Sequence, residues 1–216
     1  MQERDPQQTR RAYLEAVLEP DPARARDVVR SAVRAGTPVG EAYHEVLAPA
    51  MVEVGRRWES GAINVAHEHL AAEVTGSLVG ELAARERSGE ATGRMAVVAC
   101  SPEERHCIGG QMLAGLLEAH GWEVLYLGAT LPVPDLVALV EDEAPDAVAL
   151  STTMREFLPG VREAVEALRA TEEPPLVIVG GQAYDGEETA RRVGADVWAP
   201  SAGAGQALLG ERLPPV

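Results

Sequence analysis

The sequence has few basic residues and few cysteines, and it has no long apolar run. Of its 216 residues, 19 are Lys or Arg and 34 are Asp or Glu, so the formal net charge is −15. Nucleic-acid phosphates attract basic side chains, and this charge balance therefore argues against direct binding to DNA or RNA. No apolar stretch is long enough to span a membrane, and no signal peptide is recognised at the start. With only Cys100 and Cys107 present, a disulfide framework is not expected, and a cytoplasmic location fits best.

The first part of the chain, residues 1–88, has the pattern of a helical domain. Apolar residues recur at helical spacing in four stretches that are separated by Pro and Gly. These stretches are residues 9–18, 23–35, 38–58 and 64–85. Pro49 lies inside the third stretch and should kink it. Four helices joined by short loops predict a four-helix bundle.

The second part, residues 94–216, follows a polar, Gly-punctuated linker at residues 88–93 and alternates short apolar strands with helical patterns. The expected strands are residues 95–100, 123–127, 147–151, 176–179 and 197–199. Each is followed by a helical stretch, which predicts an α/β domain with a doubly wound, Rossmann-like parallel five-stranded sheet. Ligands of such sheets bind beyond the carboxyl ends of the strands, usually at the first loop.

That first loop carries the pattern Glu104-x-His106-x-x-Gly109 directly after a predicted strand. A carboxylate two residues from an imidazole can hold one ring nitrogen and present the other, neutral nitrogen to a metal. The alternative is a loop histidine that caps the following helix. A zinc-hydrolase motif and a phosphate-binding loop are not favoured, because neither HExxH nor GxxxxGK[ST] occurs.

Three motifs together resemble the cobalamin-binding domains of methionine synthases, methylmalonyl-CoA mutases and related light sensors. The family motif Asp-x-His-x-x-Gly has Glu104 in place of Asp. A Ser-x-Thr strand end and a Gly-Gly pair then follow in the family's order. The resemblance implies that His106 ligates cobalt from below and displaces the cofactor's nucleotide base, which leaves the cofactor base-off and His-on. By the same resemblance, these residues hold the ligand loop and the displaced tail: Glu104, Gly109, Ser151, Thr153, Gly180 and Gly181.

A second resemblance lies in the helical domain, where Trp58, nine intervening residues and Glu68-His69 match the signature of cobalamin photoreceptors. In that family a four-helix bundle caps the upper corrin face and surrounds the upper axial group, typically 5′-deoxyadenosyl. The resemblance implies a regulator rather than an enzyme. It would hold adenosylcobalamin, respond to photolysis of the cobalt–carbon bond, and act through a protein partner, such as a transcriptional regulator, or through self-association. A corrinoid methyl-carrier protein of a methyltransferase system remains the alternative.

The sequence departs from that family in two places. In its light-regulated repressors the residue after the tryptophan is a histidine that binds cobalt after photolysis, and here this position is Glu59. A bis-histidine light state through this position is therefore not expected, and His67 or His69 would have to substitute. The family repressors also carry an N-terminal DNA-binding domain, whereas this sequence starts with the predicted bundle, so a stand-alone repressor is not expected.

Overall fold

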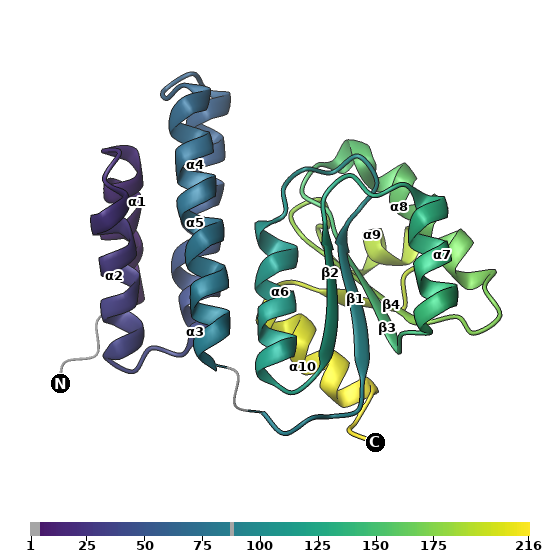
Figure 1. The fold of residues 1–216 in the computed structure, drawn as a ribbon. Helices are drawn as coiled ribbons and strands as arrows, with labels where there is room; N and C mark the ends of the chain where they lie inside the picture. Colours follow the sequence, from purple (N-terminus) through teal and green to yellow (C-terminus); the bar gives the residue numbers. More distant parts are fainter. Residues whose placement is uncertain (1–4, 87–88) are drawn as a thin grey trace. The chain divides into compact units, whose positions relative to one another are not determined.

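The computed structural model describes residues 5–86 and 89–216, and the chain divides into two compact units, Met1–Glu86 and Arg87–Val216 (Figure 1). Ser88, the first residue of the predicted linker, and the opening residues 1–4 lie outside the described residues. Within the described residues, every helix is too short or too polar to traverse a bilayer.

The first unit is helical, as the sequence predicts. Its elements are α1 (Pro6–Leu18), α2 (Pro22–Arg34), α3 (Val39–Glu41), the π-helix η1 (Ala42–Leu47), α4 (Ala48–Glu59) and α5 (Val65–Glu86). Asp5 and Asp21 cap α1 and α2, and a proline occupies the first turn of each helix, where its missing N–H costs nothing. Inside the unit, the hydroxyl groups of Tyr13 and Thr75 lie 2.7 Å apart, so these buried polar atoms satisfy each other.

At Pro49, where the sequence predicts a kink, the structure has a π-helix immediately before the proline. The N–H of Ala48 donates to the carbonyl of Tyr43, five residues back instead of four. Proline has no N–H, and in an α-helix its ring would collide with the carbonyl of Glu45. One wider turn therefore carries the chain past Pro49 without ending the helical run, and α3, η1 and α4 follow one another without a break.

The second unit is a five-stranded, all-parallel sheet with helices on both faces, which confirms the predicted fold class. Its strands are β1 (Met95–Cys100), β2 (Glu123–Gly128), β3 (Ala147–Ser151), β4 (Leu176–Gly180) and β5 (Val197–Ala199), in the spatial order β2-β1-β3-β4-β5. The α-helices are α6 (Ile108–Ala119), α7 (Val133–Glu143), α8 (Leu158–Arg169), α9 (Glu187–Arg192) and α10 (Ala202–Arg212), and a short 3-10 helix, η2 (Arg155–Phe157), precedes α8.

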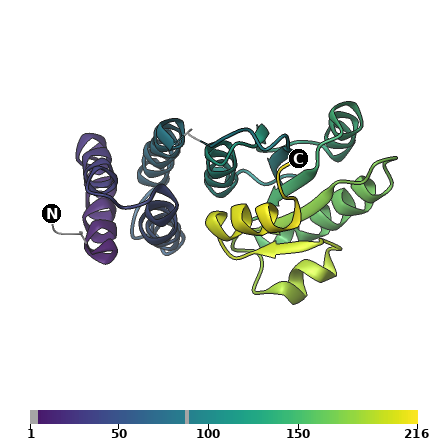
Figure 2. The same cartoon turned by 90° about the horizontal axis from the view of Figure 1, so that it is seen from below.

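Two apolar layers cover the sheet. Side chains of α6 and α10 pack on one face, and those of α7, α8 and α9 pack on the other (Figures 1 and 2). Strands buried on both faces need to be apolar throughout, and β1 (Met-Ala-Val-Val-Ala-Cys) meets that need. The chain order changes direction between β1 and β3, so the loops that follow these two strands flank the point where this fold binds ligands.

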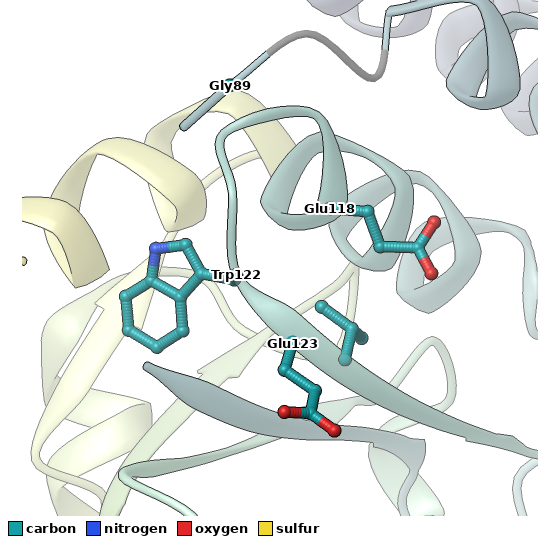
Figure 3. Close-up of a pocket in the computed structure, with 5 residues that line it drawn as sticks. Gly89, Glu118, Trp122 and Glu123 are labelled. Atoms are coloured by element: carbon teal, nitrogen blue, oxygen red, sulfur yellow. The ribbon is translucent and has the colours of Figure 1, made fainter. Parts of the chain in front are cut away.

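The segment that leads into β1 is anchored at the opposite, amino edge of the sheet. Gly89 N donates to Ala119 O (3.1 Å), and Thr92 N donates to Gly121 O (2.8 Å). A surface pocket of about 380 Å³ lies here, lined by Gly89, Glu118, Trp122, Glu123 and Val124 (Figure 3). Because it lies at the amino end of β2, this pocket is remote in the fold from the loops that carry the predicted motifs.

Gly121 makes this anchoring possible and offers a test of it. Its φ is +83°, and a Cβ added there would lie 1.9 Å from the carbonyl oxygen of Glu90. We expect Gly121→Ala to lower the free energy of unfolding of the second unit by about 1–3 kcal/mol, because it combines left-handed strain with a backbone clash. The matched control is Gly210→Ala in α10, where nothing lies within 4 Å of the added Cβ. That substitution should stabilise by about 0.5–1 kcal/mol. Urea unfolding measures both, and an unchanged midpoint for Gly121→Ala would contradict the packing.

Candidate functional site

The loop after β1 brings Glu104 and His106 together, as their spacing predicts. His106 Nδ1 lies 2.5 Å from Glu104 Oε1, and the backbone N–H groups of Arg105 and His106 donate to the same oxygen at 2.8 and 3.0 Å. The Glu104 side chain is fully buried, whereas 52% of the His106 side chain is exposed. The carboxylate is thus part of the protein interior, and the imidazole that it holds is presented at the surface.

The protonation state of Glu104 determines which histidine nitrogen carries a proton. Burial by itself raises the pKa of Glu104, but the hydrogen bonds from the His106 ring and from the backbone of His106, Thr153 and Met154 outweigh it and lower the pKa to about 2. The carboxylate is therefore ionised at neutral pH and can only accept hydrogen bonds. His106 Nδ1 must then donate, and the lone pair of the neutral ring lies on Nε2. This is the tautomer that a metal ligand requires.

Glu104 also joins the loop after β1 to the loop after β3. Its second oxygen, Oε2, accepts from Thr153 N at 2.7 Å and from Met154 N at 3.1 Å. The Glu104 carbonyl accepts from Thr130 N (3.2 Å), which adds the loop after β2. Thr153, a predicted site residue, is therefore at the site, and the contact made there comes from its backbone N–H.

Small residues gather where α6 begins and β3 ends. A Cβ added at Gly109 would lie 3.2 Å from Ser151 Oγ, and one added at Gly110 would lie 3.6 Å from Ser151 Cβ. On the neighbouring helix α10, a Cβ at Gly205 would lie 3.4 Å from Ala199 Cβ. Glycine at positions 109 and 110 keeps side-chain volume away from Ser151, the predicted polar partner of an inserted group, whereas Gly205 lies against Leu113 and Ala199. The residues present thus fit a group that takes a single nitrogen ligand, because Glu104 leaves one imidazole nitrogen of His106 as an acceptor and small residues adjoin the Ser151 hydroxyl.

The Gly180-Gly181 pair lies at the end of β4, as predicted, and packs closely against the protein itself. A Cβ at Gly180 would lie 2.9 Å from Ala199 O, and one at Gly181 would lie 2.2 Å from Thr152 O. Gly181 also has a φ of +107°. Both glycines thus let neighbouring strands approach each other, and contact between this pair and a ligand tail stays a prediction.

A pocket of about 530 Å³ opens beside the His106 loop at the carboxyl edge of the sheet. It is lined by Pro102, Glu103, Arg105, Thr130, Leu131 and Pro132. Glu103 and Thr130 have φ values of +67° and +57°, which non-glycine residues rarely adopt and which are concentrated at functional sites. Among residues 5–86 and 89–216, no three His, Cys, Asp or Glu side chains are grouped so that they could hold a metal ion on their own.

The three predicted site residues of the first unit lie at one end of the α4–α5 hairpin. Trp58 is the penultimate residue of α4, and Glu68 and His69 lie in the first turn or so of α5. The turn between the helices is tight, since Ala62 N donates to Arg57 O at 2.8 Å. Trp58 is 46% exposed, and His69 Nε2 lies 3.6 Å from Glu68 Oε2. These residues and the His106 loop belong to different units.

Sequence reasoning missed several contributors to the site. The N–H of Met154 holds Glu104, Gly110 limits side-chain volume beside Ser151, and Tyr126 OH donates to the carbonyl of Cys107 at 3.1 Å. The sequence does hold a signal for Gly110, because it stands next to Gly109 of the histidine motif. A backbone donor has no residue-specific signal, because every residue except proline carries the same N–H.

Two family models match the chain. Residues 94–209 match a model described as B12 binding domain, and residues 9–83 match a second model with the same description. The HTH-type transcriptional repressor CarH of Myxococcus xanthus is 37% identical over 180 residues, which are 81% of this chain. That alignment spans 58% of the repressor's length, so the chain corresponds to little more than half of that relative. Dimethylamine corrinoid protein 1 of Methanosarcina acetivorans is 30% identical over 80% of this chain and 83% of its own length.

Two solved structures of corrinoid- or cobalamin-binding proteins resemble this chain in fold. The Methanosarcina barkeri monomethylamine corrinoid protein superposes with a TM-score of 0.82, over 96% of this chain and 100% of that chain. At 17% identity, this likeness shows the fold alone. A cobalamin-binding protein from Desulfitobacterium hafniense DCB-2 is 27% identical, covers 93% of this chain and 97% of that chain, and has a TM-score of 0.52.

The buried carboxylate generates a stability prediction. We expect Glu104→Gln to lower the free energy of unfolding of the second unit by about 1.5–3 kcal/mol, because an amide NH₂ replaces one oxygen that accepts backbone hydrogen bonds. The matched control is Glu103→Gln, an exposed neighbour that keeps the same backbone and should change stability by less than about 0.5 kcal/mol. Equal urea midpoints for the two variants would show that Glu104 does not support the loop.

Proposed function

The chain belongs to the family of B12-binding domains, and from this premise we propose that it is a light sensor that holds adenosylcobalamin and signals through a protein partner or through self-association. Cobalamin as the cofactor follows from the family and from the corrinoid proteins among its relatives. The adenosyl form, the light response and the residue roles are the proposal. It is supported by the geometry of two groups of side chains, one in each unit.

In this proposal His106 would ligate the cobalt through Nε2. The bond from Nδ1 to Glu104 supports the role, since it places the lone pair on Nε2 and restrains the ring at a position that is 52% exposed. An ionised partner also makes the imidazole a stronger electron donor. Glu in place of the family's Asp is compatible with this role, because the longer side chain reaches both the ring and the backbone of Thr153.

The displaced nucleotide tail would lie beside Ser151. Gly109 and Gly110 support this position, because side chains there would fill the space next to the Ser151 hydroxyl. A buried polar base needs a hydrogen-bonding partner, which the hydroxyl groups of Ser151 and Thr153 can provide. Gly180 and Gly181 would contribute indirectly, because they allow the end of β4 to approach the backbone of Ala199 and of Thr152 closely.

The observation that carries the light-sensor proposal is the exposed tryptophan at the end of the α4–α5 hairpin. Trp58 and Val65 are 46% and 48% exposed at the same end of the hairpin, which leaves two large apolar side chains in water. Glu68 and His69 lie close by in sequence and can contact a polar group. We propose that Trp58, Glu68 and His69 cover the upper axial group. When bound, adenosylcobalamin supplies a cobalt–carbon bond that green light breaks. These three side chains would then detect whether the adenosyl group is present.

The second candidate is a corrinoid methyl carrier. It is favoured by the 30% identity to a dimethylamine corrinoid protein over 83% of that protein's length. A carrier must expose its methyl group to a methyltransferase, so a tryptophan over that group would hinder methyl transfer. The two candidates therefore differ in what Trp58 does, although both use His106 in the same way.

The output of a sensor of this kind would be a protein contact. The repressor relative is longer than the matched region, which spans 58% of its length. A net charge of −15 opposes direct contact with DNA phosphates. We propose that illumination changes either self-association or the affinity for a transcriptional regulator.

The ligand assignment predicts the effect of His106→Ala. In the dark, the wild-type protein with adenosylcobalamin should show a base-off, His-on visible spectrum. The variant should lose the His-on features and bind cobalamin at least about 10–100-fold more weakly, since even partners of a metal ligand have effects of that size. The control is His120→Ala, a histidine at the carboxyl end of α6 whose Nδ1 bonds to Leu116 O at 2.7 Å. A wild-type spectrum in His106→Ala would refute the assignment.

The capping proposal predicts a loss of discrimination in Trp58→Ala. Green light should irreversibly change the spectrum of the wild-type adenosyl form, together with its elution volume in size-exclusion chromatography. Trp58→Ala should reduce the preference for adenosylcobalamin over methylcobalamin by about tenfold, because truncating a buried aromatic contact removes roughly 1–2 kcal/mol or more. The control is Val52→Ala, which truncates another exposed apolar side chain of α4. An unchanged ratio in Trp58→Ala, with turnover of a methyl group by a methyltransferase, would favour the carrier.

A further inference from the structure

Three consecutive backbone carbonyls of the His106 loop each accept a hydrogen bond from a side chain. Cys107 Sγ donates to Arg105 O at 3.1 Å, and Cys100 Sγ donates to His106 O at 3.6 Å. Tyr126 OH donates to Cys107 O at 3.1 Å. Glu104 already holds the N–H groups of Arg105 and His106. The backbone on both sides of the imidazole is therefore restrained through its donors and through its acceptors.

Of these three donors, Tyr126 alone comes from another strand. It lies on β2, an edge strand, and it pairs with Val98 of β1. The next pair in the ladder joins Ala99 to Gly128, so Leu127 is an extra residue and the strand carries a β-bulge directly after Tyr126. Bulges occur next to active sites, where they redirect side chains. Gly128, with a φ of +70°, completes the irregular turn of the strand.

The ring of Tyr126 lies against the first turn of α6. A Cβ added at Gly110 would be 3.6 Å from Tyr126 Cε2, so the missing side chain at Gly110 lets the ring come close to the helix. Cys107 is the N-cap residue of α6, and its carbonyl is the atom that the Tyr126 hydroxyl binds. The β2 strand thereby contacts the residue that directly follows His106.

From this arrangement we infer that Tyr126 is a positioning residue for His106. It holds the loop from the β2 side, while Glu104 holds it from the β3 side. The inference rests on the proposed role of His106 as the cobalt ligand. Tyr126 makes no contact with the metal in this role; it restricts where His106 Nε2 can lie by restraining the next residue in the chain.

A role in positioning can be separated from a role in folding, because the Cys107 carbonyl has a second donor. Gln111 N donates to the same oxygen at 2.9 Å, as the first hydrogen bond of α6. Removal of the Tyr126 hydroxyl therefore leaves the acceptor paired, and 37% of the tyrosine is already exposed. We expect Tyr126→Phe to fold with nearly the wild-type stability and to let the loop shift.

The test compares the wild-type chain with the Tyr126→Phe variant of the same chain. With adenosylcobalamin in the dark, the variant should show a lower His-on fraction in the visible spectrum and about threefold to tenfold weaker binding, the effect of one hydrogen bond. In the apo protein, the ¹⁵N signals of the His106 ring should broaden or shift toward a mixture of tautomers. The apo melting temperature should stay within about 2 °C of the wild type.

The matched control is Tyr43→Phe, which removes a hydroxyl that also donates to a backbone carbonyl, that of Val79 at 2.8 Å in the helical unit. It should lower stability and leave the His106 ring signals unchanged. A Tyr126→Phe variant with the wild-type His-on fraction and affinity would overturn the inference, as would a loss of stability without spectral change. His106→Ala separates a failure of this inference from a failure of the proposed function. If His106→Ala retains the His-on spectrum, the proposed role of His106 is wrong, whatever the result for Tyr126→Phe.

Discussion

A single buried carboxylate, that of Glu104, organises the site. It is removed from water and yet ionised, a state that is stable only because five hydrogen bonds reach its two oxygens, four of them from backbone N–H groups. Those donors come from the loops after β1 and β3, so the same contact closes the carboxyl edge of the sheet and selects the histidine tautomer. An imidazole held in this way needs little further ordering when it binds a partner.

One fold serves the two functional classes among the relatives, so the scaffold cannot decide between them. Under the proposed function, the His106 loop and the small residues near Ser151 would serve a sensor and a carrier alike. The two proposals differ in the role of Trp58, which is exposed at the end of the α4–α5 hairpin.

The fold was predictable because its signals are periodic and local. Apolar runs such as Met95–Cys100 and Ala147–Ser151 match the strands residue for residue, and proline and glycine mark most helix ends. The Glu104–His106 contact was predictable for the same reason, since two residues on one loop determine it. The contact between Glu104 and Thr153 joins a side-chain oxygen to a backbone N–H 49 residues away, and periodicity holds no information about it. The same holds for Tyr126, whose direction depends on a bulge, and for the Gly180-Gly181 pair, whose closest neighbours are the carbonyl oxygens of Ala199 in β5 and of Thr152 after β3.

The π-helix before Pro49 makes the length of one segment as important as its composition. A π-turn holds one residue more than an α-turn, so η1 acts as an insertion that the helical run has absorbed. Loss of any one residue between Ala42 and Leu47 would restore ordinary helical spacing and bring the ring of Pro49 back against the carbonyl four residues before it. The extra residue and the proline therefore depend on each other, and a deletion in this segment would require a second change at Pro49. The course of α4, and with it the position of Trp58 near its end, thus depends on a proline in the first turn of the same helix.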